Sequence, residues 1–209
     1  MASPQMDSVD RAMMARCIDL SVRSGKEGEY PYGAVIRRAD KVFVESINRV
    51  AHEHDVTRHA EVVAISQAQK ELGTVSLDDC MIYVSAEPCA YCSYAIRESR
   101  IARVVYGLRS PHMGGVLKWN VLADDDLSST MPEVFAPPPE IIAGFMAHEV
   151  EQALLAWNPL VWTAVKRRGL FVAGPLEAVR QRDATRRASL AERTMAILRR
   201  VVFDRFGRR

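Results

Sequence analysis

Two short stretches, His59-Ala60-Glu61 and Pro88-Cys89-Ala90-Tyr91-Cys92, decide how this chain is interpreted. Each stretch is weak evidence alone, because His-x-Glu is common by chance and Cys-x-x-Cys also occurs in redox pairs and in zinc half-sites. In this order, and with a proline before the first cysteine, they combine three metal-ligand side chains with one carboxylate. Together the two stretches predict a catalytic metal centre.

The ligand types in these stretches favour zinc. Zinc binds Cys thiolates and His nitrogens in tetrahedral geometry, and catalytic zinc sites keep one position open for water. His59, Cys89 and Cys92 would supply three protein ligands. A Cys-x-x-Cys at the start of a helix lets both thiolates face one ion, and the N–H groups there help to keep them ionised. We therefore expect a Zn²⁺ site with one open position.

The combined pattern resembles the H-x-E … P-C-x-x-C signature of the zinc-dependent nucleobase deaminases. Zinc lowers the pKa of a bound water toward about 7, which provides hydroxide at neutral pH. Deamination also needs a proton on the ring nitrogen beside the attacked carbon and a protonated amine that can leave. A carboxylate beside the metal can carry both protons. Glu61 follows His59 by two residues, so we expect it to be the catalytic acid–base group rather than a ligand.

A zinc ion that only stabilises the fold is the main alternative interpretation of the cysteines. Structural zinc sites have four Cys or His ligands. The fourth ligand would have to come from His52, His54, Cys80 or His112. This interpretation leaves Glu61 without a role, and a redox Cys-x-x-Cys explains still less of the pattern. Both are therefore disfavoured.

The bulk composition is that of an ordinary globular protein, with 48% hydrophobic and 26% charged residues among 209. No apolar run reaches the roughly 18 to 20 residues of a membrane span, and the start lacks the pattern of a secretory signal. Four cysteines are too few for a disulfide framework, and thiolate ligands need a reducing compartment. These features predict a cytoplasmic protein without membrane contact.

Charge is distributed unevenly along the chain. From Lys166 onward there are 13 basic and 4 acidic residues, a net charge of +9, whereas the remainder carries 15 basic and 22 acidic residues, or −7. The basic tail could contact the phosphates of a nucleic acid. Its apolar side chains recur at helical spacing, however, which favours a helix over residues 183–206 that packs on its own domain or on a partner subunit.

Apolar periodicity and turn residues predict the order of the helices and strands. Helices are expected over residues 7–23, 59–72, 89–100 and 146–156, and strands over residues 33–36, 41–47, 81–84, 103–106 and 140–144. Gly73 is expected to end its helix as a C-cap. Residues 109–132 are expected to form a long loop, because Gly114-Gly115 and three consecutive aspartates from Asp124 argue against a packed element. This order implies helices on both faces of a mixed sheet.

The chain resembles the cytidine deaminase superfamily, and within it the branch of the guanine deaminases and tRNA adenosine deaminases. The residues that carry the resemblance are Gly33-Ala34-Val35, Asn48, Thr57-Arg58-His59-Ala60-Glu61, Glu87 to Cys92 and Arg103 to Gly107. The resemblance implies a three-layer α/β/α fold with a five-stranded mixed sheet, and a homodimer. We expect a deaminase domain over residues 1–168 and a basic helical extension over residues 169–209.

The resemblance also implies substrate contacts. Asn48 lies where this branch has a substrate-contacting asparagine, although an asparagine after a strand can equally form a turn. Val35 and Ala60 are expected to lie beside the base. Arg58, Tyr91 and Tyr94 differ from the residues that many relatives carry at these positions, so they bear on which substrate is bound.

The identity of the base stays open among several interpretations. The resemblance favours a purine such as guanine, as a free base or nucleoside. A tRNA-specific adenosine deaminase is the first alternative, because the basic tail could bind tRNA, and a cytosine or cytidine deaminase is another. A zinc-stabilised binding module without activity is the remaining one.

Overall fold

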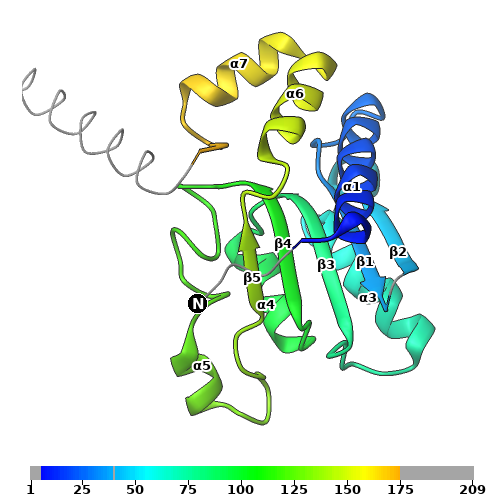
Figure 1. Cartoon of the computed structure of the whole chain (residues 1–209), viewed down its shortest axis with the longest axis vertical. Coiled ribbons are helices and arrows are strands. Elements are labelled where there is room, and N and C mark those ends of the chain that lie inside the picture. Colours follow the sequence, from blue (N-terminus) through cyan, green and yellow to red (C-terminus); the bar gives the residue numbers. More distant parts are fainter. Residues whose placement is uncertain (1–5, 40, 175–209) are drawn as a thin grey trace, which may run out of the picture. The chain divides into compact units, whose positions relative to one another are not determined.

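The computed structural model describes residues 6–39 and 41–174 (Figure 1). The helix predicted over residues 183–206 and the basic extension beyond Gly174 lie outside the described residues. Within the described part, none of the helices combines the length and the apolar character needed to cross a membrane.

Five strands form one mixed sheet. They are β1 (Gly33–Arg38), β2 (Lys41–Ile47), β3 (Cys80–Ala86), β4 (Arg103–Leu108) and β5 (Glu140–Ala143). Their order across the sheet is β2-β1-β3-β4-β5. β1 pairs antiparallel with β2 and β3, and β4 pairs parallel with β3 and β5. The predicted five-stranded mixed sheet is confirmed.

Helices cover both faces of this sheet (Figure 1). The helices are α1 (Ser8–Lys26), α2 (Val50–Glu53), α3 (Ala60–Leu72), α4 (Ala90–Glu98), α5 (Asp125–Thr130), α6 (Ala147–Trp157) and α7 (Pro159–Arg167). α1 and α6 pack together on one face, while α3 and α4 cover the other. α7 packs on α6, and α2 and α5 lie in connections. The three-layer α/β/α arrangement follows the prediction.

The alternation of side chains along the strands builds two cores, one on each face of the sheet. On β3, Ile82 and Val84 pack with α3 and α4, whereas Tyr83 between them lies in the core under α1 and α6. Successive side chains of a strand point to opposite faces, so every buried strand serves both cores. At Gly33 a side chain would overlap the backbone of Cys17, so this glycine permits the close packing of α1 on β1.

Three helices were not predicted: the short α2, α5 and α7. α7 begins with Pro159 in its first turn, and Asn158 both ends α6 and caps α7, since its side chain accepts a hydrogen bond from the Val161 N–H. α5 lies inside the region predicted to be loop, where Asp124 caps it. Gly73 is the predicted C-cap of α3, in the left-handed conformation.

Candidate metal centre

The three predicted metal ligands lie at the starts of two helices. His59 is the N-cap residue of α3, Cys89 is the N-cap residue of α4, and Cys92 lies in the first turn of α4. Only Glu87 and Pro88 separate the end of β3 from Cys89. The carboxyl end of β3, the central strand, therefore lies close to both thiols and to the start of α3.

The geometry of the three side chains fits a tetrahedral zinc ion. The Cys89 Sγ lies 3.6 Å and the Cys92 Sγ 3.3 Å from His59 Nδ1, and all three ligand atoms lie within 4.8 Å of one another. Zn–S bonds of about 2.3 Å and Zn–N bonds of about 2.0 Å at the tetrahedral angle would separate sulfur from nitrogen by about 3.5 Å. The spacing and the thiolate–imidazole donor set thus agree with one shared ion.

The donor group contains three members in the part of the chain that the structure describes. Two residues considered as a fourth ligand have other partners. The His52 Nδ1 lies 2.8 Å from the Glu29 carboxylate, and the buried Cys80 thiol contacts Asp79 at the start of β3. Three protein donors leave one position open, as in catalytic rather than structural zinc sites.

The surroundings of the two thiols shift their pKa values in opposite directions. A hydrogen bond from the Cys92 thiol, together with the nearby His59, lowers the pKa of Cys89 to about 4 against the effect of burial. The same hydrogen bond and burial raise the pKa of Cys92 well above its ordinary value, so one of the two thiols ionises first. Hydrogen bonding to Cys89 raises the pKa of His59.

Glu61 lies in the first turn of α3, beside the ligand group. Burial and the charge of Cys89 raise its pKa to about 7, while the charge of His59 and a hydrogen bond with Cys92 act in the opposite direction. Efficient general acid–base catalysts have a pKa near the working pH, because they must both accept and release a proton. Glu61 therefore has the position and the proton affinity that proton transfer at neutral pH requires.

Asn48, the first of the predicted substrate-contact residues, lies in the segment that leads from β2 to His59. Asn48 follows β2 and is bracketed by two contacts to the His59 region: the Ser46 Oγ donates to the Ala60 carbonyl at 2.6 Å, and the Arg49 N–H donates to the Arg58 carbonyl at 3.0 Å. Asn48 itself is 1% exposed, and its side-chain amide donates to Glu29. These bonds hold the chain around Asn48 against the two residues that flank His59.

Ala60 and Val35 are both fully buried, but on opposite sides of the sheet. Ala60 lies at the start of α3, in the core that faces α3 and α4. The Val35 side chain lies in the core under α1, so it points away from the helix that carries His59 and Glu61. A contact between Val35 and a base would have to use its backbone.

Two buried charged side chains organise the long connection between β4 and β5, and the sequence patterns did not reveal either. The Glu87 carboxylate accepts hydrogen bonds from the N–H groups of Ser110, Val116 and Leu117 at 2.8 to 3.0 Å. Gly114 forms a bridge with Cys89, and a side chain at Gly114 would overlap Glu87. The turn that presents Cys89 is thereby joined directly to this connection.

Arg97 fixes the far part of the same connection. Its side chain is 1% exposed, although it is an arginine on α4. The guanidinium donates to the carbonyls of residues 121, 122, 124 and 136 and to the Ser128 hydroxyl. A buried charge is tolerated when hydrogen bonds satisfy it. The predicted loop is therefore a packed segment.

Exposed aromatic and basic side chains lie near the metal ligands. The Tyr91 ring is 45% exposed and meets the His59 ring edge to face at 5.7 Å, and Tyr94 is exposed one turn further along α4. Arg58 directly precedes His59. The Trp119 side chain is 58% exposed and lies under the Lys118 ammonium group. The backbone N–H of Trp119 donates to the carbonyl of Gly114, the bridge partner of Cys89.

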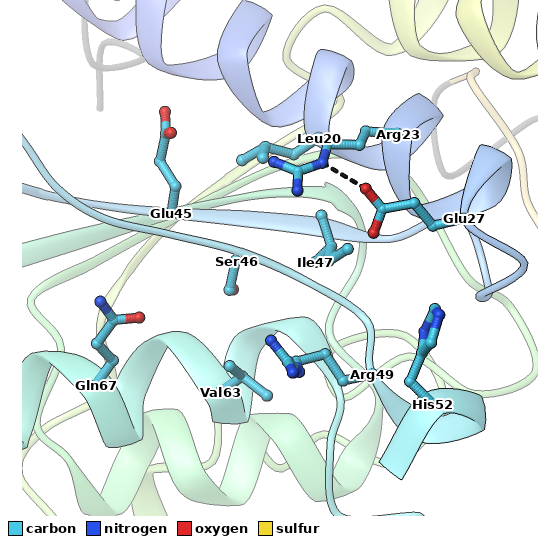
Figure 2. A pocket seen from close by; sticks show the side chains of 10 residues that line it. All are labelled: Leu20, Arg23, Glu27, Glu45, Ser46, Ile47, Arg49, His52, Val63 and Gln67. Carbon is cyan, nitrogen blue, oxygen red and sulfur yellow. Dashed lines mark hydrogen bonds and ion pairs between the residues drawn. The ribbon is translucent and has the colours of Figure 1, made fainter. Parts of the chain in front are cut away.

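A cavity of about 380 Å³ lies along the edge strand β2 (Figure 2). Its ten lining residues come from α1 and its C-cap, β2, α2, α3 and the β2–α2 turn, and they do not include the three metal ligands. Figure 2 shows Arg23 of α1 paired with Glu27, the C-cap residue of α1, above Ile47 of β2. The cavity is thus separate from the metal centre.

Comparison with known proteins places the chain in a family. Residues 7–108 match the model of the cytidine and deoxycytidylate deaminase zinc-binding region. The chain is 35% identical over 116 residues to a tRNA-specific adenosine deaminase of Aquifex aeolicus, covering 55% of this chain and 77% of that protein. The chain therefore belongs to the zinc-dependent cytidine and deoxycytidylate deaminase family, whose members hydrolyse C–N bonds of cyclic amidines.

Solved structures agree with the fold. A structure from a study of A-to-I editing by tRNA:A34 deaminases at the wobble position of transfer RNA is 29% identical, with a TM-score of 0.58, and covers 68% of this chain and 99% of that one. The guanine deaminase of Nitrosomonas europaea is 21% identical, with a TM-score of 0.57, and covers 76% and 89%. At that identity the second likeness concerns the fold alone.

Proposed function

We propose that this protein is a hydrolytic deaminase that replaces the exocyclic amine of an aminopurine with oxygen and releases ammonia. The observation that carries the proposal is the group of His59, Cys89 and Cys92, spaced for one zinc ion, with the Glu61 carboxylate beside it. Bound zinc would activate water for attack on the ring carbon that bears the amine.

Glu61 is assigned the proton transfers. Its raised pKa suits a group that both accepts and releases protons near neutral pH. Glu61 would take one proton from the attacking water and deliver it to the ring nitrogen beside the attacked carbon. It would then take the remaining proton of the added hydroxyl group and deliver it to the amine, which leaves as ammonia. His59, Cys89 and Cys92 hold the metal in this scheme, and Asn48 contacts the base. A structural zinc site would give no role to a carboxylate at this position.

Adenosine in a tRNA loop is the substrate that we propose first. The sequence relatives that act on tRNA support it, as do the exposed Tyr91, Tyr94 and Trp119 near the metal ligands. Aromatic side chains that stack on unpaired bases, next to basic groups that meet phosphates, are typical of proteins that bind single-stranded RNA. Arg58 and Lys118 supply such basic groups.

Free guanine, the base favoured by the sequence resemblance, is the second candidate. One feature of the structure supports a small enclosed base: Phe171 packs edge to face on Tyr32 at 6.0 Å, and Val172 bridges to Arg109 after β4. The Phe171 ring thus packs beside Tyr32. Burial and the nearby charge of Glu61 raise the pKa of Tyr32.

Ammonia release distinguishes these substrates. The full chain loaded with zinc is incubated with guanine, adenosine, cytosine, cytidine and a tRNA anticodon stem-loop that contains adenosine, with Glu61→Ala as the inactive control. We expect release from the stem-loop that is lost in Glu61→Ala although zinc is retained. Release from guanine alone would replace the first candidate by the second, and zinc retention without release from any substrate would contradict an enzymatic function.

A further inference from the structure

Glu29 is a buried carboxylate whose partners all belong to the segment that leads to His59. Its side chain is completely buried. It accepts hydrogen bonds from the Asn48 amide at 2.9 Å, from the N–H groups of Ala51 and His52 at 3.0 and 2.7 Å, and lies 2.8 Å from the His52 ring. Removing a carboxylate from water is costly, so such a group persists where several donors converge on it.

The bond to Glu29 determines which way round the Asn48 amide lies. An ionised carboxylate only accepts hydrogen bonds, so it must face the NH₂ group of Asn48 and not its carbonyl oxygen. The two ends of an asparagine amide are otherwise interchangeable in shape. One N–H of the Asn48 side-chain amide donates to Glu29, so the amide oxygen and the second N–H can bind another partner.

Asn48 occupies a place where this orientation matters. The contacts from Ser46 to Ala60 and from Arg49 to Arg58 tie the chain on both sides of Asn48 to the residues that flank His59. We propose that Glu29 is a positioning residue that fixes the orientation in which the Asn48 amide meets the substrate base. This inference rests on the proposed function, since it requires a base at the metal centre.

Glu29→Gln is the test, because it keeps the shape of the side chain and removes its acceptor-only character. A glutamine at this position can turn its own NH₂ toward Asn48 or toward the Ala51 and His52 N–H groups, and the Asn48 amide can then adopt either orientation. We measure kcat/KM by ammonia release for the zinc-loaded wild type, Glu29→Gln, Asn48→Ala and the double variant.

A positioning role predicts that the two substitutions are coupled. Glu29→Gln should lower kcat/KM about 10- to 100-fold when Asn48 is present, and less than about 3-fold in Asn48→Ala. Glu45→Gln, which removes a carboxylate from the exposed face of β2, is the matched control and should leave kcat/KM unchanged. Zinc content and the circular dichroism spectrum are recorded for each variant.

The outcomes separate this inference from the proposed function. Equal losses from Glu29→Gln in both backgrounds would show that Glu29 supports only the fold, which overturns the inference and leaves the deaminase intact. A wild type that releases no ammonia from any substrate would overturn both. If Glu29→Gln fails to fold, Glu29→Asp takes its place in the same cycle, because it keeps the charge but shortens the reach to Asn48.

Discussion

The metal ligands and the two segments beside them are held in place by different means. His59, Cys89 and Cys92 are fixed by the backbone of two helix starts, within a few residues of each. The segments 48–58 and 109–139 are instead held by buried charged side chains that lie far away in the sequence. The comparison indicates that the capacity to bind zinc is encoded locally, whereas the shape around it depends on long-range hydrogen bonds.

This difference predicts two separable classes of defect. A buried polar group that loses its partner costs about 1–3 kcal/mol, so a segment held by one carboxylate or guanidinium depends strongly on that residue. Removing such a residue should disturb the surroundings of the site while zinc stays bound. Removing a ligand residue should abolish zinc binding while the surrounding segments stay in place.

Cys92→Ser should have the largest effect, because it replaces a thiolate ligand by a hydroxyl. We expect loss of stoichiometric zinc and a fall in the deamination rate of at least about 10³-fold, since water is no longer activated. Metal analysis and ammonia release measure both. Cys80→Ser, at an equally buried cysteine on β3, should keep its zinc. Stoichiometric zinc in Cys92→Ser would contradict the ligand assignment.

Arg97→Met tests the other region. It removes the donors to the carbonyls of the 109–139 segment, so the free energy of unfolding should fall by about 3 kcal/mol and KM should rise. Urea denaturation and steady-state kinetics are the measurements, and zinc content should not change. Arg100→Met is the control, because the half-buried Arg100 donates to one carbonyl, that of Glu133. Equal effects of the two substitutions would refute the assigned role of Arg97.

The free energy of unfolding should depend on pH through the ionisation of Glu29. Burial alone would raise its pKa, but hydrogen bonds from Ala51, His52 and Asn48 outweigh this effect and hold the pKa at about 2, below the ordinary value of 4.5. Its stabilisation is therefore fully present above about pH 4.5 and is lost as the pH falls toward 2.

Metal-free Glu29→Gln should be less stable than the metal-free wild type by about 2–3 kcal/mol at pH 7, and this difference should shrink at pH 3. Urea denaturation at the two pH values measures it. A difference that is the same at both pH values would mean that the carboxylate charge is not what stabilises this segment.

Glu45→Gln should have the smallest effect, since it belongs to neither region. The Glu45 carboxylate pairs with Arg16 on the surface, where water and salt screen the attraction. We expect the free energy of unfolding to change by less than about 0.5 kcal/mol. A loss above about 1 kcal/mol in thermal or urea unfolding would place this pair among the structural determinants.

The sequence predicts the metal centre and the sheet well because their signals are local. Pro88 lies directly before Cys89, the N-cap residue of α4, and proline is tolerated at a helix start but not inside a helix. Alternating burial follows from strand periodicity. Two of the missed helices also had local signals: Asn158-Pro159 is an N-cap followed by a proline at the first helical position, and acidic residues after Asp124 favour the start of α5.

Glu29, Glu87 and Arg97 could not be recognised in the same way. Their partners lie about 20 to 40 positions away, and nothing in the neighbouring residues marks a charged side chain as buried. Only the tertiary structure brings donor and acceptor together. The same limit applies to Val35, because a strand pattern does not say which face of the sheet meets the substrate.

The ligand positions at two helix starts have a consequence for folding. N-cap residues commonly stabilise a helix by about 1 kcal/mol through a side-chain hydrogen bond, and neither His59 nor Cys89 makes one. A zinc ion held by both would cross-link α3 to α4 across about 30 residues of chain, much as a disulfide does, for which the chain-entropy model gives roughly 3–4 kcal/mol. Chelation should therefore increase hydrogen exchange at both helix starts, so that the first turns of α3 and α4 report on metal occupancy.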